Sequence, residues 1–219
     1  DVYKRQKKIY TTFEDTLAYL PKDKSDFVGA TVREDLKQGN QKRGYQLTGF
    51  DHDKKVLLVM GGSLGSKKLN EIIRQNLEPL LHDYHIIHLT GKGLVDSSIN
   101  KEGYIQYEFV KDDLTDLLAI TDTVVSRAGS NAIYEFLTLR IPILLVPLGL
   151  DQSRGDQIDN AKNFESKGYS RHILEDDLTD IKLLEALSNI EKHRESIIKQ
   201  MKTYKAVSYT HLRAQETVL

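Results

Sequence analysis

A strand, a glycine turn and a helix follow one another directly in this chain, and the unit recurs along it. Residues 56–60 form a continuous apolar run, which is typical of a strand buried on both faces. The glycine-rich residues 61–66 follow at once, and apolar side chains then recur at helical spacing over residues 69–81. Comparable patterns predict strands at 85–90, 104–109, 123–126, 143–146 and 169–174, and helices at 114–120, 131–139, 157–167, 178–190 and 191–204. This alternation predicts an α/β fold with a Rossmann-like parallel sheet covered by helices on both faces.

The chain divides unevenly. Residues 51–206 have the size and pattern of one complete α/β domain. Residues 7–50 are polar, with a single short strand candidate at 27–29 and a linker-like stretch rich in Lys, Gln, Gly and Asn at 37–44. The two tips, 1–6 and 207–219, fit neither neighbouring pattern and resemble translated vector sequence. We therefore predict that both tips are non-native and exclude them from the fold.

Composition excludes several classes of protein. The net charge of −1 argues against a nucleic-acid partner. The absence of cysteine rules out disulfides and thiolate metal sites. We find no apolar run of about 18 residues and no apolar segment after the basic start, so we expect neither a membrane span nor a signal peptide.

The turn at residues 61–66 predicts a phosphate site. Glycines between a buried strand and a helix let backbone N–H groups approach an anion at the positive end of the helix dipole, and Ser63 can add a hydroxyl. Lys67 and Lys68 stand in the first helical turn, where a bound diphosphate would offset their unfavourable placement. The spacing matches neither Gly-x-Gly-x-x-Gly nor a Walker A loop. A plain tight turn stays open as the alternative.

The next strand argues against a dinucleotide. A Rossmann site for NAD would place an acid at the end of that strand to hold a ribose. Here the strand ends in His88, Leu89 and Thr90, and Asp83 lies before it.

Residues 126–135 provide a second motif. Ser126 closes a strand and Gly129 permits a tight turn. We expect Ser130 or Asn131 to cap the following helix. Glu135 lies about one turn inside this helix, where its carboxylate could accept hydrogen bonds from a ribose diol. The alternative is that Glu135 only complements the helix dipole.

Residues 147–161 form the third motif, a polar loop that leads from an apolar strand into a helix. Asp156, Gln157 and Asn160 supply the mixed donors and acceptors that sugar hydroxyls need. Capping of the helix by Asp156 explains the same residue without a ligand.

Metal and nucleophile chemistry lack support. His82, His85 and His88 are three residues apart, and His85 and His88 point to opposite faces of a strand, so these two cannot share a metal. We find no His-Glu-x-x-His and no Gly-x-Ser-x-Gly motif. We therefore expect no metal site and no acyl-transfer nucleophile.

The three motifs, in this order, resemble the MurG family of peptidoglycan glycosyltransferases of the Gram-positive type, from about residue 8 to about 206. The resemblance implies a GT-B fold of two Rossmann-like domains, of which this chain carries the C-terminal, donor-binding half and the tail of the N-terminal half. It also implies transfer of N-acetylglucosamine from UDP-N-acetylglucosamine to lipid I, giving lipid II, by inversion and without a cofactor.

The resemblance assigns substrate-binding roles residue by residue. Ser63 would lie at the diphosphate, Val110 would contact the uracil through its backbone, and Glu135 would hold the ribose. Gln157, with Asp156 beside it, would hold the sugar hydroxyls. The residues that would surround the nucleotide are Ser130, Asn131, Ala132, Ile133, Tyr134 and Glu135. Arg33 matches the arginine of the family's Gly-Asn-Pro-Val-Arg segment, although Ala30 and Thr31 replace the Asn and Pro.

The resemblance places the rest of the machinery outside this chain. The family's N-terminal glycine-rich loop, its histidine base and its membrane-docking patch have no counterpart here. We therefore assign no catalytic residue, and expect the lipid I acceptor and a peripheral contact with the cytoplasmic face of the membrane to use the absent half. The isolated chain is expected to bind donor weakly and to transfer nothing.

Two other functions remain open from the residues. A UDP-sugar 2-epimerase would share the fold and the donor chemistry. A non-catalytic nucleotide-binding module would need only the glycine turn at residues 61–66 and the carboxylate of Glu135.

Overall fold

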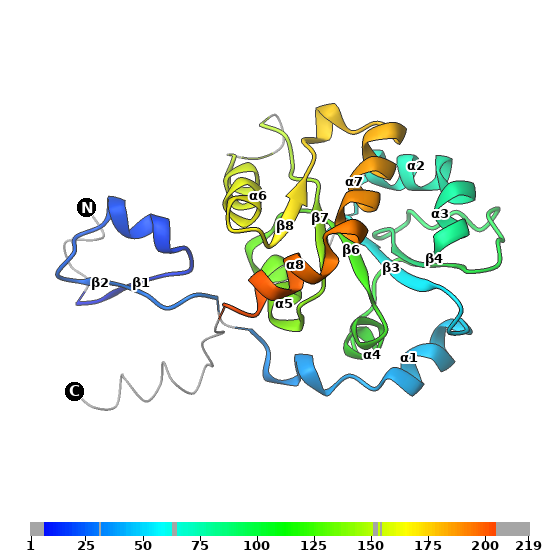
Figure 1. Cartoon of the computed structure of the whole chain (residues 1–219), viewed down its shortest axis with the longest axis horizontal. Helices are drawn as coiled ribbons and strands as arrows, with labels where there is room; N and C mark the ends of the chain where they lie inside the picture. Colours follow the sequence, from blue (N-terminus) through cyan, green and yellow to red (C-terminus); the bar gives the residue numbers. More distant parts are fainter. Residues whose placement is uncertain (1–6, 31, 63–64, 151–152, 154, 205–219) are drawn as a thin grey trace. The chain divides into compact units, whose positions relative to one another are not determined.

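The computed structural model describes residues 7–30, 32–62, 65–150, 153 and 155–204. The chain forms two compact units, divided between Glu34 and Asp35 and again between Tyr204 and Lys205. The larger unit is Asp35–Tyr204. Figure 1 shows the helices and strands of both units, coloured along the sequence.

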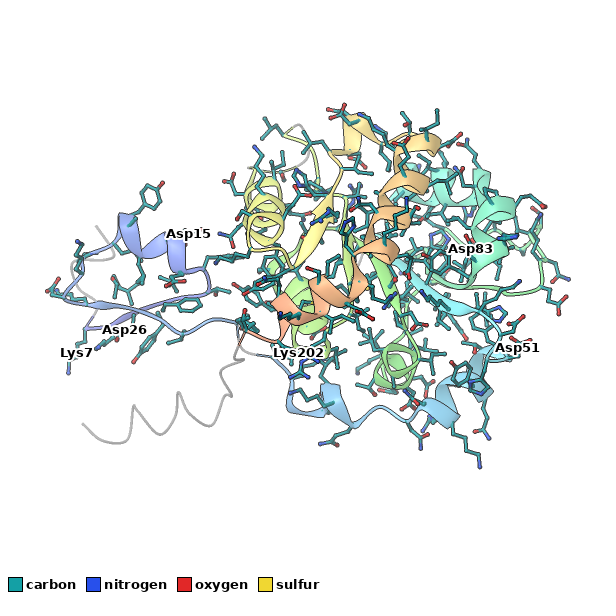
Figure 2. The ribbon with its side chains drawn as sticks, in the orientation of Figure 1. Lys7, Asp15, Asp26, Asp51, Asp83 and Lys202 are labelled. Carbon is teal, nitrogen blue, oxygen red and sulfur yellow. The ribbon has the colours of Figure 1, made fainter. Side chains whose placement is uncertain are left out.

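The smaller unit contains one parallel strand pair. Strand β1 (Ile9–Thr11) pairs with β2 (Ser25–Phe27), and the 3₁₀ helix η2 (Glu14–Tyr19) lies between them in sequence. Lys8 Nζ contacts Asp26 Oδ2 of β2 at 2.5 Å; Asp26 is labelled in Figure 2. The strand expected at 27–29 therefore lies two residues earlier. It stops before Gly29, whose φ of 73° is left-handed and incompatible with an extended strand.

The larger unit is built on a six-stranded sheet with strand order β5-β4-β3-β6-β7-β8. Every neighbouring pair is parallel. The strands are β3 (Lys55–Met60), β4 (Tyr84–Leu89), β5 (Tyr104–Tyr107), β6 (Thr123–Ser126), β7 (Ile143–Leu145) and β8 (Ser170–His172). The predicted α/β class and parallel sheet are confirmed, with strand ends within three residues of those expected.

Helices follow every strand of this sheet except β4, and the last two come after the final strand, β8. They are α2 (Lys67–Gln75), α3 (Leu77–Asp83), α4 (Leu114–Ala119), α5 (Ser130–Leu139), α6 (Asp156–Ser166), α7 (Asp180–Lys192) and α8 (Arg194–Met201), with the 3₁₀ helix η4 (Glu175–Asp177) after β8. Helix α7 packs on β7 and β8. Within the described residues, no helix combines the length and the apolar character needed to cross a bilayer.

The segment expected as one helix over 69–81 is two helices, α2 and α3, which meet at Asn76. Asn76 has φ −103° and ψ 16°, outside the helical range. Its Nδ2 donates to the carbonyl of Ile72 at 2.8 Å and to Asp180 Oδ1 at 2.7 Å. The backbone N–H of Asn76 also donates to the Ile72 carbonyl, at 3.2 Å. The side chain therefore adds a second hydrogen bond at the end of α2 and ties this junction to Asp180.

The expectation that residues 37–44 form an exposed linker is wrong. The 3₁₀ helix η3 (Glu34–Gln38) precedes helix α1 (Gln41–Thr48), and Asn40 Oδ1 caps α1 by accepting from Arg43 N at 3.2 Å. Gly44 is buried because α1 packs against α4, and a Cβ on it would lie 2.4 Å from the carbonyl oxygen of Asp116. The glycine is a close-packing residue, so the larger unit begins at Asp35 and not at Asp51.

The core of the larger unit lies along the central strands. Val56, Leu57, Leu58 and Val59 of β3 are fully buried, as are Val124 and Val125 of β6. Asp122 fixes the start of this central pair, since its Oδ2 accepts from Val56 N and its own N–H donates to Val56 O, both at 2.8 Å.

Candidate functional site

The order of the strands reverses between β3 and β6. These strands are neighbours in the sheet, although β4 and β5 separate them in sequence, and their last residues, Met60 and Ser126, are directly paired. Ligands of parallel α/β sheets bind beyond the carboxyl ends of the strands at such a reversal. The three motif loops, after β3, β6 and β7, all begin at this edge.

The loop after β3 is shaped by its glycines. Gly62 and Gly65 have φ of 88° and 75°, and Gly65 N donates to Gly62 O at 3.0 Å. Ser66 then caps α2, with its Oγ accepting from Leu69 N at 3.2 Å. The first backbone N–H groups of α2 thus border this loop, as anion binding requires. Ser63 lies outside the described residues, so its diphosphate role stays a prediction.

Arg127 directly follows β6 and is 6% exposed. One guanidinium nitrogen, Nη2, donates to Ser66 Oγ at 2.6 Å and forms an ion pair with Glu175 of η4. The other, Nη1, donates to the carbonyls of Val146 at 3.1 Å and Pro147 at 3.4 Å. Arg127 lies within the second motif, residues 126–135, but no role was assigned to it from the sequence. The signal that could have indicated it is a charged residue immediately after a buried strand.

Helix α5 starts differently from the expectation. Gly129 is its N-cap, with φ −66° and ψ 132°, and no side chain caps the helix. The prediction that Ser130 or Asn131 is the cap is therefore wrong. These two residues are instead the first residues of the helix proper. Their own backbone N–H groups are among the first of the helix, so they border the same edge of the sheet as α2.

The other residues predicted along α5 differ in exposure. Ile133 is fully buried and Tyr134 is 4% exposed, with the Tyr134 ring edge-on to Phe164 at 5.1 Å between centroids. Ala132 and Glu135 are half-buried. The Ile133 N–H donates to the Gly129 carbonyl at 3.2 Å, so this residue presents no free group to a ligand, whereas the half-buried Glu135 carboxylate retains access.

The loop after β7 is tied to α6. Gly155, with φ 88°, is the N-cap of this helix, and Asp156 is the exposed first residue after the cap. Gln157 Oε1 accepts from Leu148 N at 3.2 Å. Asn160 Nδ2 donates to the Ala128 carbonyl at 2.9 Å and so joins α6 to the loop after β6. The alternative explanation of Asp156 as a helix cap is therefore not what the structure shows.

Two predicted residues lie apart from these loops. Val110 follows β5 and is half-buried, next to Phe109, which is 69% exposed. Arg33 belongs to the smaller unit, so it is not among the residues that the larger unit brings together.

A chain of buried hydrogen bonds ends at the Thr90 carbonyl, beside the glycine loop at residues 61–66. Tyr104 Oη and His88 Nδ1 are 2.8 Å apart, His88 Nε2 and Asn70 Oδ1 are 3.0 Å apart, and Asn70 Nδ2 donates to the Thr90 carbonyl at 2.8 Å. The amide oxygen of Asn70 can only accept, so His88 carries its proton on Nε2 and Tyr104 donates to Nδ1. Burial, together with the charge of Arg74, lowers the pKa of His88 to about 3, which keeps the ring neutral.

His85 lies on the same strand as His88 but has different hydrogen-bond partners. Its Nε2 lies 2.8 Å from Asp51 Oδ1 and 2.9 Å from Asp53 Oδ1, and its ring stacks on Phe50 at 4.6 Å. The ligand atoms of these three groups lie within 4.8 Å of one another. Hydrogen bonds from Asp53 and His85 hold the pKa of Asp51 well below its usual range. Hydrogen bonds among Asp51, Asp53 and His85 account for this cluster. The sequence did not predict it, because both acids precede β3 and lie about thirty residues from His85.

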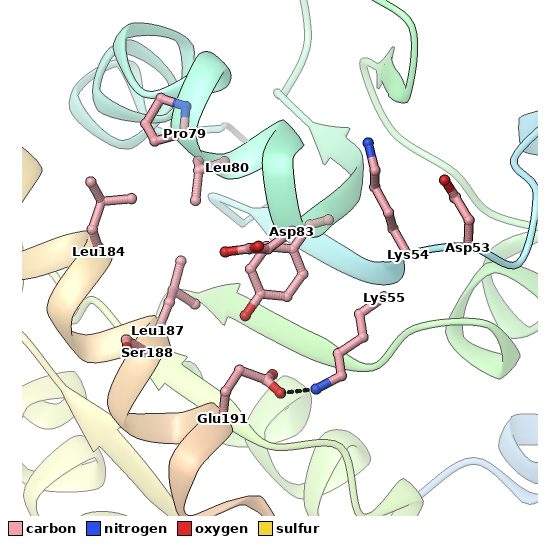
Figure 3. A pocket seen from close by; sticks show the side chains of 11 residues that line it. Asp53, Lys54, Lys55, Pro79, Leu80, Asp83, Leu184, Leu187, Ser188 and Glu191 are labelled. Atoms are coloured by element: carbon pink, nitrogen blue, oxygen red, sulfur yellow. Dashed lines mark hydrogen bonds and ion pairs between the residues drawn. The ribbon is translucent and has the colours of Figure 1, made fainter.

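A pocket of about 610 Å³ lies at the opposite, amino-terminal edge of the sheet (Figure 3). Tyr84 and Lys55, which start β4 and β3, line it together with Glu191 of α7, and Lys55 pairs with Glu191. None of the residues predicted to bind substrate lines this pocket. The pocket is therefore separate from the three motif loops at the carboxyl ends of the strands.

Comparison with known proteins identifies the family. The family model described as "Glycosyltransferase family 28 C-terminal domain" matches residues 56–215. This chain belongs to that family. The match runs past residue 206, where we expected native sequence to end, so that boundary stays a prediction. Membership favours a glycosyltransferase over the epimerase and over the non-catalytic module.

Curated relatives are similar over nearly the whole chain. A Staphylococcus epidermidis protein named UDP-N-acetylglucosamine--N-acetylmuramyl-(pentapeptide) pyrophosphoryl-undecaprenol N-acetylglucosamine transferase is 84% identical over 204 residues, which are 93% of this chain and 57% of that protein. A Staphylococcus aureus protein of the same name is 72% identical over 204 residues, with the same coverage. The chain thus spans little more than half the length of these relatives.

Solved structures confirm the fold. The crystal structure of Acinetobacter baumannii MurG has a TM-score of 0.64 at 21% identity, over 87% of this chain and 56% of that one. A glycotransferase of kitacinnamycin has a TM-score of 0.69 at 17% identity, over 97% of this chain and 54% of that one. The larger unit therefore has the fold of the C-terminal domain of GT-B glycosyltransferases.

Proposed function

We propose that this chain is the donor-binding half of an enzyme that transfers N-acetylglucosamine from UDP-N-acetylglucosamine to lipid I and so forms lipid II. The observation that carries the proposal is the 84% identity, over 93% of this chain, to a transferase whose name states that reaction. We propose that the lipid I acceptor, the base that activates it and a peripheral contact with the cytoplasmic face of the membrane would use a part of the enzyme that this chain does not match.

The geometry supports a division of roles along the sheet edge. The N-termini of α2 and α5 would face the diphosphate, and Ser63 would add a hydroxyl. Glu135 would accept from the ribose, and the backbone of Val110 would contact the uracil. Gln157 would use its amide NH₂ on the sugar hydroxyls, because its Oε1 already accepts from Leu148. Asp156 would make a further contact with the sugar-nucleotide. Arg33 belongs to the smaller unit, so its role rests on the resemblance alone.

Such a site holds the donor but does not activate the acceptor. Inverting transfer needs a base beside the acceptor hydroxyl and a sugar held in line with it. We place only the second requirement in this chain.

Calorimetric titration of the 219-residue chain with UDP, UDP-N-acetylglucosamine and NAD tests the proposal. We expect binding of both uridine nucleotides and none of NAD. Glu135→Ala should abolish UDP binding, whereas Glu185→Ala, which removes an exposed carboxylate on α7, should leave it unchanged. Binding of NAD, or no binding of UDP, would overturn the donor site.

The same chain should transfer no sugar. Incubated with UDP-N-acetylglucosamine and lipid I, it is expected to yield no lipid II. Measurable product would show that the acceptor chemistry is present in these residues.

A further inference from the structure

Arg127 joins four loops of the sheet edge through one guanidinium group. It lies at the start of the loop after β6 and contacts Ser66 after β3, the carbonyls of Val146 and Pro147 after β7, and Glu175 after β8. Arg127 and Glu175 are 6% and 5% exposed, so the charge of each is compensated by the other away from solvent.

The contact with Ser66 reaches the expected diphosphate position. Ser66 Oγ accepts from Arg127 Nη2 at 2.6 Å while it caps α2 through Leu69 N. A hydroxyl oxygen has two lone pairs, and these two donors use both of them. The orientation of the Ser66 hydroxyl, and with it the end of the glycine loop, is therefore set by Arg127.

The contacts with the loop after β7 reach the expected sugar position. Arg127 Nη1 fixes the carbonyls of Val146 and Pro147, and the next residue, Leu148, donates its N–H to Gln157 Oε1. This bond turns the Gln157 side chain so that its amide NH₂ is left for a ligand. Asn160 strengthens the same link by donating to Ala128, the neighbour of Arg127.

We propose that Arg127 is a positioning residue that couples the diphosphate loop to the sugar-binding loop, so that the two halves of the donor site are held in one mutual geometry. This inference rests on the proposed donor function. Arg127 acts through Ser66 and Gln157 and itself touches no substrate. A planar fork is needed, because a lysine ammonium cannot hold a hydroxyl, a carboxylate and two carbonyls in fixed directions at once.

The chain contains a matched control at the other end of the same strand. Arg194 donates to Thr123 Oγ1 at 2.6 Å, to the Asp122 carbonyl at 3.0 Å and to both carboxylate oxygens of Glu191. It is a second arginine fork on a hydroxyl, a carbonyl and a carboxylate, but it lies at the amino end of β6. Arg194→Lys therefore reproduces the loss of a fork without touching the site.

Calorimetry on the 219-residue chain provides the first test. Arg127→Lys should weaken UDP binding about tenfold or more and remove the additional affinity for UDP-N-acetylglucosamine over UDP. Arg194→Lys should leave both affinities within about twofold of the unaltered chain. Unaltered binding by Arg127→Lys would overturn the inference, while failure of the unaltered chain to bind UDP would overturn the proposed function instead.

A double-mutant cycle provides a second test that a purely structural role would not satisfy. Ser66→Ala and Gln157→Ala, combined in the chain with Arg127 intact, should show coupling of about threefold or more in the affinity for UDP-N-acetylglucosamine. In the Arg127→Lys background their effects should multiply independently. Circular dichroism will show whether Arg127→Lys folds. If it does not, the cycle with Arg127 intact still tests the inference, because independent effects of Ser66→Ala and Gln157→Ala on affinity would contradict the proposed coupling.

Discussion

A Cβ on Gly65 would lie 2.1 Å from the carbonyl oxygen of Thr90, closer than any two such atoms can approach. The same carbonyl accepts from Asn70 Nδ2, so it is fixed at the end of the chain of bonds that runs through His88 to Tyr104. Gly65 thus seats the glycine loop directly on the end of β4.

Gly65→Ala should destabilise the chain by about 2 kcal/mol or more, because it combines left-handed strain with a backbone clash. Gly62→Ala is the matched control. Gly62 has φ 88°, but among the described residues no atom lies within 4 Å of its Cβ position, so only the strain of about 1 kcal/mol applies. Urea unfolding of both variants measures the difference. Equal losses would show that the contact with Thr90 carries no energy.

His88 should make stability fall in weak acid. Its pKa is about 3 in the folded chain against an ordinary 6.5, so below 6.5 the unfolded chain binds the proton first. The contribution is complete above pH 6.5 and is lost as the pH falls toward 3, by up to about 1.4 kcal/mol per pH unit. Urea unfolding between pH 7 and 4 should show this slope.

His88→Gln should reduce the slope, and His82→Gln, at an exposed ring, should retain it. An NMR titration in which the His88 ring takes up its proton near pH 6.5 would refute the assignment.

Gly44→Ala should loosen helix α1 from α4. The added methyl would lie 2.4 Å from Asp116 O and 2.9 Å from Ile120 Cγ2, for an expected loss of about 2 kcal/mol or more. Gln46→Ala, at an exposed position of the same helix, should change stability by no more than about 0.5 kcal/mol. Thermal unfolding of the two variants compares them. Matching melting temperatures would mean that residues 35–50 are not part of the larger unit.

Gln157→Ala should separate sugar recognition from nucleotide recognition. We expect it to weaken UDP-N-acetylglucosamine binding about tenfold and UDP binding much less, because its amide faces the sugar in the proposed site. Gln75→Ala, which truncates an exposed side chain at the end of α2, is the control. Competition between the two ligands on one immobilised chain measures both effects. An equal loss of affinity for UDP would contradict the assignment of Gln157 to the sugar.

The strands were predictable because their signal is local. The apolar runs that became β3 and β6 need no knowledge of distant residues, and Ser126 ends β6 where the sequence indicated. In a parallel sheet the carboxyl ends of the strands lie at one edge, which is why the three motifs could be placed together. The order of the strands was not predicted from the sequence.

The errors arose where distant residues decide local structure. The stretch 37–44 looks like a linker until α4, some seventy residues later, supplies the surface on which Gly44 packs. Gly129 caps α5 through its backbone conformation, which the polar neighbours Ser130 and Asn131 concealed. The partner of Arg127, Glu175, lies 48 residues away, so no spacing rule could connect them.

The reversal of strand order also has a consequence for folding. Residues 55–107 build the three strands on one side of the reversal and residues 123–172 build the three on the other, so each half-sheet can form from contiguous chain. Within the six-stranded sheet, the pairing of β3 with β6 joins the two halves. A nucleotide bound where β3 meets β6 would bind only when the two halves are docked. By mass action it would therefore stabilise the docked state. We therefore expect a bound nucleotide to stabilise the last step of folding, the docking of the two half-sheets. It should slow their separation more than it slows the unfolding of either half-sheet.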